Sequence, residues 1–291
     1  MSLLQAEFRD QCRGLRRLAM RTWAGRLLGR RPDARLAAGT SATDQCDYTN
    51  GDDIRYIDWN RCARHDELLS RRFEGREDHH VHLLLDCSAS MRVGEPKKFE
   101  LARRVAAAIG YLALAGHERV GAAVFAESTR AQLPPVAGNR GLSNLLAFFD
   151  TLTVTQEATD LRAAAAAHLR GRPRPGLVVL VSDLLDPEGY RPAIDLLRGR
   201  HQVHVMQLYA RCEAEPSELG PLRLNEVETG RSHRLCAEAR DLKNYRIVFG
   251  EFLRSVQSYC ASRGVELTQV AADVDFAECL ASNMRKSHGV S

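Results

Sequence analysis

Five residues with oxygen-bearing side chains stand where predicted strands end or where a predicted helix begins. Asp86, Ser88 and Ser90 form a D-x-S-x-S sequence directly after one short apolar run, and Asp183 follows another. Thr159 lies between them, at the start of a predicted helix. Alternate residues leaving a strand share a side, so Asp86, Ser88 and Ser90 can converge on one point. Carboxylates and hydroxyls of low total charge are the ligands of a small hard cation, and Mg²⁺ is the metal we expect here, with Mn²⁺ or Ca²⁺ as alternatives.

The elements that must position these residues alternate between short strands and helices. We expect strands over 81–85, 120–125, 129–133, 177–181, 202–208 and 265–270, and helices over 97–115, 141–150, 159–169, 190–197, 242–262 and 276–284. This alternation predicts an α/β fold with a mostly parallel sheet and helices on both faces. In such sheets ligands bind beyond the carboxyl ends of the strands, which is where the five residues fall.

The same residues allow a second chemistry, that of a metal-dependent hydrolase. Asp86 and Asp183 would then hold the metal, and Asp160 or Asp186 would act as the base. The sequence has no G-x-x-x-x-G-K-S/T phosphate loop, no G-x-G-x-x-G after a strand and no G-x-S-x-G elbow. It also offers no evident general base, so we expect a protein without enzymatic activity.

Four histidines lie in or beside predicted strands. His80 and His82 lie on one side of the first strand, and His201 and His204 flank the start of another. Two imidazoles at this spacing could bind zinc, but the surrounding sequence offers no obvious third ligand. We therefore expect histidines of an edge strand.

The net charge of +4 is unevenly distributed along the chain. Residues 1–31 carry eight arginines against Glu7 and Asp10, whereas the remaining 260 residues hold 33 basic and 35 acidic groups. Nucleic-acid binding by the main body is therefore not expected, because such a domain carries a basic stripe. Residues 4–23 predict an amphipathic helix with arginines on its polar face. We expect this helix to dock on the body or on a partner; binding to nucleic acid or to an anionic membrane is the alternative.

No apolar stretch approaches the roughly 20 residues of a spanning helix, and no secretory signal is evident. We therefore expect no transmembrane segment and a cytoplasmic location. The eight cysteines are scattered without a C-x-x-C pair, which predicts reduced thiols.

A motif upstream of the metal-site residues resembles a known family. The sequence G-D-D-I-R-Y-I-D-W at 51–59 is followed by Ala-Arg at 63–64, and Phe-Glu at 73–74 leads into D-x-S-x-S-M. On these residues the chain is identified as a member of family 58 of the domains of unknown function. These are bacterial and archaeal proteins that resemble von Willebrand factor type A domains. The five oxygen-bearing residues resemble the metal-ion-dependent adhesion site of those domains.

The resemblance implies a Rossmann-like type A domain with a small β-rich appendage. We expect a basic helix and linker over 1–38, the β-rich segment over 39–78, and the type A-like domain over 79–291 with a hairpin insertion near 221–237. Asp52, Asp53 and Asp58 of the motif form either a second acidic site or a turn in which Asp58 pairs with a nearby arginine. The turn is favoured, because G-D-D is a strong turn sequence.

The resemblance also assigns roles and a partner. It implies that Asp86, Ser88 and Ser90 coordinate the ion directly, that Thr159 does so directly or through water, and that Asp183 acts mostly through water. An acidic side chain of a protein partner would complete the site. The implied partner is a MoxR-type AAA+ ATPase, so the expected function is that of a Mg²⁺-dependent adaptor in chaperone-like assembly, metal insertion or stress tolerance.

Overall fold

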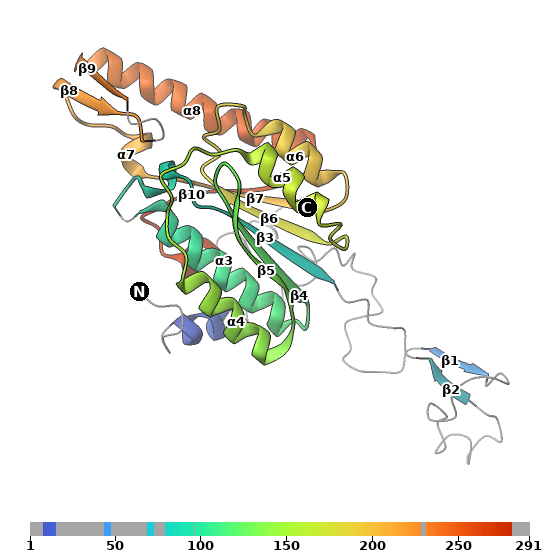
Figure 1. Cartoon of the computed structure of the whole chain (residues 1–291). Coiled ribbons are helices and arrows are strands. Elements are labelled where there is room, and N and C mark those ends of the chain that lie inside the picture. The colour runs from blue at the N-terminus through green and yellow to red at the C-terminus, as the bar shows by residue number, and fades with distance from the viewer. Residues whose placement is uncertain are drawn as a thin grey trace. The chain divides into compact units, whose positions relative to one another are not determined.

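The computed structural model of the chain describes residues 8–15, 44–47, 69–72, 79–95, 97–227 and 231–280 (Figure 1). The chain divides into two units, one formed by residues 1–30 and 79–291 and the other by residues 31–78. In the second unit, β1 (Asp44–Asp47) and β2 (Leu69–Arg72) pair antiparallel. The G-D-D motif and its three aspartates lie outside the described residues.

A six-stranded sheet forms the centre of the first unit. In chain order its strands are β3 (His80–Asp86), β4 (Arg119–Phe125), β5 (Thr129–Val136), β6 (Leu177–Ser182), β7 (Gln202–Tyr209) and β10 (Glu266–Ala271). They lie side by side in the order β10-β7-β6-β3-β4-β5, all parallel except β5, which runs antiparallel to β4. The prediction of a mostly parallel α/β sheet is confirmed.

The strand order reverses its direction between β3 and β6. From β3 the chain adds β4 and β5 on one side, then crosses back to add β6, β7 and β10 on the other. The carboxyl ends of β3 and β6 therefore lie side by side at a topological switch point, where doubly wound sheets bind their ligands.

Helices cover both faces of this sheet (Figure 1). On one face pack α3 (Lys98–Ala115) and α4 (Gly138–Asp150), and on the other α5 (Leu161–Arg170), α6 (Arg191–Arg198) and α8 (Ala239–Ser262). Alternate residues of β6 belong to opposite cores, since Val179 and Val181 pack with α3 and α4 whereas Val178 and Leu180 pack with the other helices. Both sides of the strand are buried, which explains why its sequence is a continuous apolar run.

The short elements lie in the connections between the main strands. They are η2 (Ala89–Arg92), α7 (Arg211–Ala214), and the antiparallel pair β8 (Gly220–Asn225) and β9 (Ser232–Ala237). Residues 276–280 are also helical. Among the described residues, no helix is long and apolar enough to cross a membrane.

Several predicted boundaries differ from the structure, since α4 and α8 each begin three residues earlier than expected, and two other differences have a local cause. The helix expected from Thr159 begins at Leu161, because the Asp160 side chain accepts a hydrogen bond from the Ala163 amide and so caps the helix one residue before its start. The strand expected to end at Leu133 continues through two prolines to Val136. Proline is tolerated there because β5 is an edge strand.

The N-terminal residues 8–15 are helical and bury their apolar face in the domain. Phe8, Cys12 and Leu15 belong to the core on the α3 face, and the Phe8 ring lies 5.2 Å from that of Phe276. This burial favours docking of the helix over membrane binding for residues 8–15. The rest of the helix predicted over 4–23 lies outside the described residues.

Candidate functional site

The structure places the predicted site residues at the carboxyl ends of β3 and β6. Asp86 ends β3 and Asp183 directly follows β6, so the two carboxylates come from neighbouring strands at the switch point. Ser88 and Ser90 lie in the turn that follows β3, and Thr159 lies just before α5. All five residues are buried, with at most 8% of any of them exposed.

Backbone hydrogen bonds join the loops that carry these residues. The Ala89 amide donates to the Glu157 carbonyl at 2.8 Å, and the Thr155 amide donates to the Cys87 carbonyl at 2.8 Å. These bonds fix the D-x-S-x-S turn against the loop that leads to Thr159.

Asp86 is held from two sides. Its Oδ1 accepts from the Ser88 amide at 2.9 Å, and its Oδ2 accepts from the Ser182 hydroxyl at 2.6 Å. Burial raises the pKa of Asp86 to about 7, and the nearby charge of Asp183 adds to this, although the hydrogen bonds from Ser182 and Ser88 lower it. A cation beside Asp86 would favour its ionised form.

The hydroxyl groups of the site suit an oxygen-coordinated ion. Ser88 Oγ and Ser90 Oγ lie 3.1 Å apart. Thr159 Oγ1 is buried and has no hydrogen-bond partner. A buried hydroxyl without a partner costs free energy, and coordination to an ion or its bound water would satisfy it. The set of donors therefore fits a hard divalent cation.

A buried lysine that the sequence interpretation missed lies beside Asp183. Lys98 Nζ donates to Asp183 Oδ2 at 2.7 Å and to Glu213 Oε1 at 2.5 Å, and the Lys98 side chain is fully buried. Burial lowers the pKa of Lys98, but Asp183 and Glu213 more than offset this, so its pKa is raised and it stays an ammonium ion. One feature of the sequence could have indicated this contact. Lys98 lies in the first turn of a helix, where the helix dipole disfavours a positive charge unless a carboxylate is near.

The contacts of Asp183 match an indirect role at a cation. Its Oδ2 is occupied by Lys98, and its Oδ1 accepts from the Leu185 amide at 3.0 Å. Both oxygens therefore already have protein donors, which suits contact with an ion through water. When Asp86 is ionised, the carboxylates of Asp86, Asp183 and Glu213 carry three negative charges, and the Lys98 ammonium carries one positive charge. A divalent cation would balance the remaining charge of −2.

The two carboxylates considered as a general base have structural partners. Asp160 Oδ1 accepts from the Ala163 amide at 2.6 Å. Asp186 Oδ2 accepts from the Leu161 amide at 2.8 Å, and its Oδ1 accepts from the Glu188 amide. Both groups stabilise the start of α5, and Asp186 also stabilises the turn that contains Glu188. These contacts do not support the hydrolase alternative.

The prediction that His80 and His82 lie on an edge strand is wrong. β3 lies inside the sheet between β4 and β6, and His80 and His82 are both buried. The sequence indicated no third ligand beside these residues, but the rings of His168 and His201 both lie beside His82.

A mostly parallel sheet in this order, with an antiparallel edge strand at β5, defines a doubly wound α/β domain, the fold that the resemblance to type A domains implied. The family described as "Protein of unknown function DUF58" matches residues 44–247, more than half of the sequence. The chain therefore belongs to the DUF58 family, as the G-D-D and D-x-S-x-S motifs predicted.

Relatives of the chain occur in mycobacteria. An uncharacterized protein of Mycobacterium tuberculosis (strain ATCC 25618 / H37Rv) is 28% identical over 187 residues, which cover 63% of this chain and 59% of the relative. An uncharacterized protein of Mycobacterium bovis matches to the same extent. The chain thus spans about three-fifths of the length of these relatives.

Several solved structures are distantly similar. BatB from Bacteroides thetaiotaomicron has a TM-score of 0.44 at 15% identity and covers 73% of this chain and all of its own. An aerotolerance-related membrane protein from Bacteroides fragilis has a TM-score of 0.45 at 17% identity, covering 72% of this chain and 98% of its own. A von Willebrand factor type A protein from Catenulispora acidiphila has a TM-score of 0.43 at 12% identity, covering 72% and 42%. The fold assignment rests on the strand order of the chain itself.

Proposed function

We propose that this chain is a Mg²⁺-dependent protein-binding adaptor. Asp86, Ser88, Ser90 and Thr159 would hold the ion, and Asp183 would contact it through water. The observation that carries the proposal is a buried group of oxygen donors at the switch point, with an unpartnered Thr159 hydroxyl and more carboxylates than ammonium groups. The ion would supply a coordination position for a carboxylate of the partner.

Adaptor function is supported over hydrolysis by the state of the nearby carboxylates. A hydrolase needs a carboxylate that takes a proton from water, whereas Asp160 Oδ1 accepts from the Ala163 amide and both oxygens of Asp186 accept from the amides of Leu161 and Glu188. We therefore propose binding without turnover.

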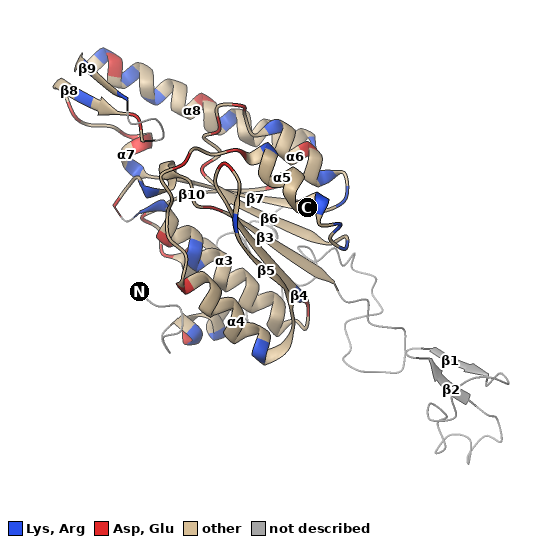
Figure 2. Ribbon diagram, viewed as in Figure 1, with Lys and Arg blue, Asp and Glu red and all other residues tan. Residues whose placement is uncertain are grey.

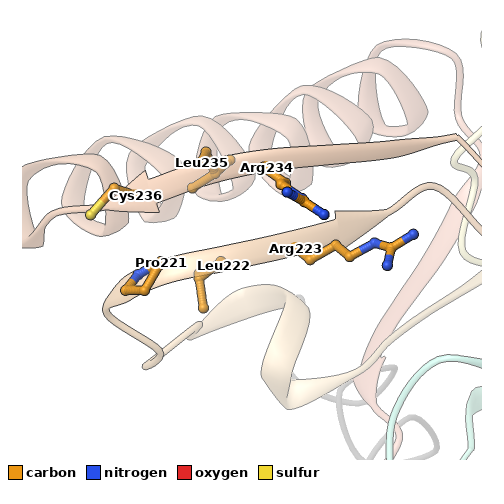
Figure 3. Close-up of a pocket in the computed structure, with 6 residues that line it drawn as sticks. All are labelled: Pro221, Leu222, Arg223, Arg234, Leu235 and Cys236. Carbon is orange, nitrogen blue, oxygen red and sulfur yellow. The ribbon is translucent and has the colours of Figure 1, made fainter.

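An exposed apolar surface supports a protein partner. It lies on the β8–β9 hairpin and the first half of α8, where Leu224, Leu235 and Val248 are exposed by 50%, 40% and 63%. Pro221, Leu222, Leu235 and Cys236 line a shallow hollow on the hairpin together with Arg223 and Arg234 (Figure 3). Exposed apolar side chains gathered in one region are typical of protein interaction sites.

The charges of the hairpin suit an acidic partner. Arg223 and Arg234 lie directly opposite each other in the β8–β9 register. Like charges at opposed positions destabilise a strand pair, so an acidic surface against them would relieve the repulsion. The hairpin follows α7, and Glu213 of α7 contacts the Lys98 ammonium that also holds Asp183. Acidic residues occur in α7 and in the loops at this end of the sheet, where a bound cation would offset them (Figure 2).

The proposed partner is a MoxR-type AAA+ ATPase, with the adaptor acting in assembly, metal insertion or stress tolerance. The choice follows from the match to DUF58 over residues 44–247, because the resemblance to that family implies association with such ATPases. The cytoplasmic location remains a prediction.

Binding of the chain to a MoxR-type AAA+ ATPase tests the proposal. We expect a pull-down in millimolar Mg²⁺ to be lost with EDTA and with Asp86→Ala. Asp195→Ala is the matched control, since Asp195 is exposed on α6, outside the proposed site. Retention of the ATPase by Asp86→Ala in the presence of EDTA would show that the ion does not bridge the two proteins.

A further inference from the structure

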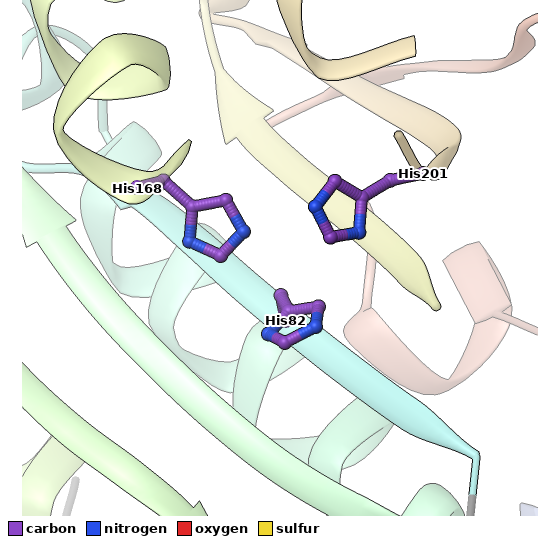
Figure 4. A group of neighbouring side chains, drawn as sticks. All are labelled: His82, His168 and His201. Carbon is purple, nitrogen blue, oxygen red and sulfur yellow. The ribbon is translucent and has the colours of Figure 1, made fainter. Parts of the chain in front are cut away.

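A group of three histidines lies at the amino ends of the strands, the end of the sheet opposite Asp86. His82 is the third residue of β3, His201 directly precedes β7, and His168 lies in the last turn of α5. Figure 4 shows the three imidazole rings turned toward one another from these separate segments. We call this group the histidine cluster.

The ring positions suit one shared ion. Ring centroids lie 4.9 Å apart for His82 and His168, 5.1 Å for His82 and His201, and 5.3 Å for His168 and His201. One nitrogen from each ring lies within 4.8 Å of the other two. In a tetrahedral zinc site, with Zn–N distances of about 2.0–2.1 Å, ligand nitrogens lie roughly 3.4 Å apart, so each nitrogen needs to move by about 1 Å. Side-chain rotation can supply such a movement.

The hydrogen bonds leave ring nitrogens available to a metal. His82 Nε2 lies 3.0 Å from the Arg174 carbonyl and donates to it, so Nδ1 carries the lone pair. This is the arrangement in which a second hydrogen bond orients a metal-binding imidazole. His168 Nε2 is buried without a hydrogen-bond partner. Neither ring nitrogen of His201 makes a well-formed hydrogen bond, although the backbone of Gly176 is near enough to raise the pKa of His201 slightly against the effect of burial.

The protonation states also favour metal binding. Burial is the main cause that lowers the pKa of His168 to about 3 and that of His201 to about 4, and it lowers the pKa of His82 as well. Each ring faces the other members of the cluster, and His80 and Arg200 also lie near. A positive charge on any of these groups disfavours protonation of the ring. The three imidazoles are therefore neutral at pH 7.

We propose that His82, His168 and His201 form a Zn²⁺ site that is separate from the oxygen-rich site at Asp86. Imidazole nitrogens suit zinc and other late first-row metals, whereas Mg²⁺ requires oxygen ligands, so the two ends of the sheet select different ions. Three protein ligands leave the fourth zinc position for water. The bound ion ties the end of α5 to the starts of β3 and β7, so it holds the helix that begins beside Thr159.

Metal titration of the full chain tests this site. The Cys212→Ser/Cys236→Ser background removes the two exposed thiols that the structure describes, and excess Mg²⁺ occupies the Asp86 site. We expect calorimetry with Zn²⁺ to show one ion per chain, and His168→Gln and His201→Asn to weaken binding by about tenfold or more. His233→Gln is the matched control, because His233 is exposed on β9, and it should bind Zn²⁺ like the parent.

The proposal is overturned if the parent chain binds no Zn²⁺ or if both cluster variants bind it unchanged. Should either variant lose its far-UV circular dichroism, X-ray absorption of the zinc-loaded parent chain decides the question. We expect a shell that contains three imidazoles; a shell of sulfur, or of oxygen alone, refutes the site. These readouts do not depend on partner binding, so failure of the adaptor proposal would leave them interpretable.

Discussion

Replacing Lys98 with methionine should strongly destabilise the domain. Methionine has a similar length and no charge, so the substitution keeps most of the packing and leaves Asp183 and Glu213 without their shared ammonium. Asp183 and Lys98 are almost completely buried, and removal of one partner from a buried ion pair costs about 3–5 kcal/mol. That loss is a large part of the about 5–15 kcal/mol by which a typical domain is stable.

Urea unfolding followed by circular dichroism in EDTA measures this loss. The matched control is Lys97→Met, which changes an exposed lysine one residue earlier and should alter the free energy of unfolding by less than about 0.5 kcal/mol. The double variant Lys98→Met/Glu213→Gln should recover part of the loss, because one of the two unpaired charges is gone. Equal unfolding midpoints for Lys98→Met and Lys97→Met would refute the view that Lys98 neutralises the site.

The pH dependence of the two proteins should differ. In the wild type the pKa of Lys98 is raised above its ordinary 10.5, so its stabilisation is complete below pH 10.5 and is lost only as the pH rises through the folded-state pKa. In Lys98→Met the unpaired carboxylates resist ionisation, so the deficit should be full between about pH 8 and pH 10, where Lys98 of the wild type is charged, and should shrink as the pH falls and the carboxylates take up protons. A deficit that stays constant from pH 8 to pH 4 would indicate lost packing and not lost charge.

Two further variants test single side chains. Thr159→Val removes a buried hydroxyl that has no hydrogen-bond partner, so the free energy of unfolding without Mg²⁺ should rise by about 1 kcal/mol, whereas calorimetry should show Mg²⁺ binding weakened by about tenfold. Unchanged Mg²⁺ affinity would remove Thr159 from the site. Burial lowers the pKa of His204 in the folded chain from 6.5 to about 4. Between these two pH values the unfolded chain binds a proton that the folded chain does not, so stability should fall as the pH drops from 6.5 toward 4. His204→Gln should remove part of that fall in thermal melts, and an unaltered pH profile would show that folding does not lower the pKa of His204.

The sheet was predictable because its signals are local. The runs 81–85 and 177–181 are apolar on both sides and end in polar residues, and each is a strand with helices on both faces. The positions of Asp86 and Asp183 follow from the same pattern, because parallel neighbours bring their carboxyl ends to one edge. The start of α5 was misplaced by two residues, since either Thr159 or Asp160 could cap the helix and only the fold selects Asp160.

The charge balance and the histidine cluster depend on contacts between distant parts of the chain. Lys98 is 85 residues from Asp183 and 115 from Glu213, and no periodic pattern relates them. His168 stands in the last turn of α5, where a basic side chain is ordinary because it complements the helix dipole, so nothing in the sequence marks it as a partner of His82.

α5 connects the two ends of the sheet, and this explains why the proposed sites should be studied together. Thr159 and Asp160 lie before its first turn, where the Asp186 carboxylate accepts from the Leu161 amide, and His168 lies in its last turn. A shift of α5 along its own axis would move Thr159 relative to Asp86 and would move His168 relative to His82 by the same amount. An ion at the histidine cluster would therefore restrict the position of Thr159, so Zn²⁺ binding and Mg²⁺ affinity should be coupled if α5 moves as a rigid helix.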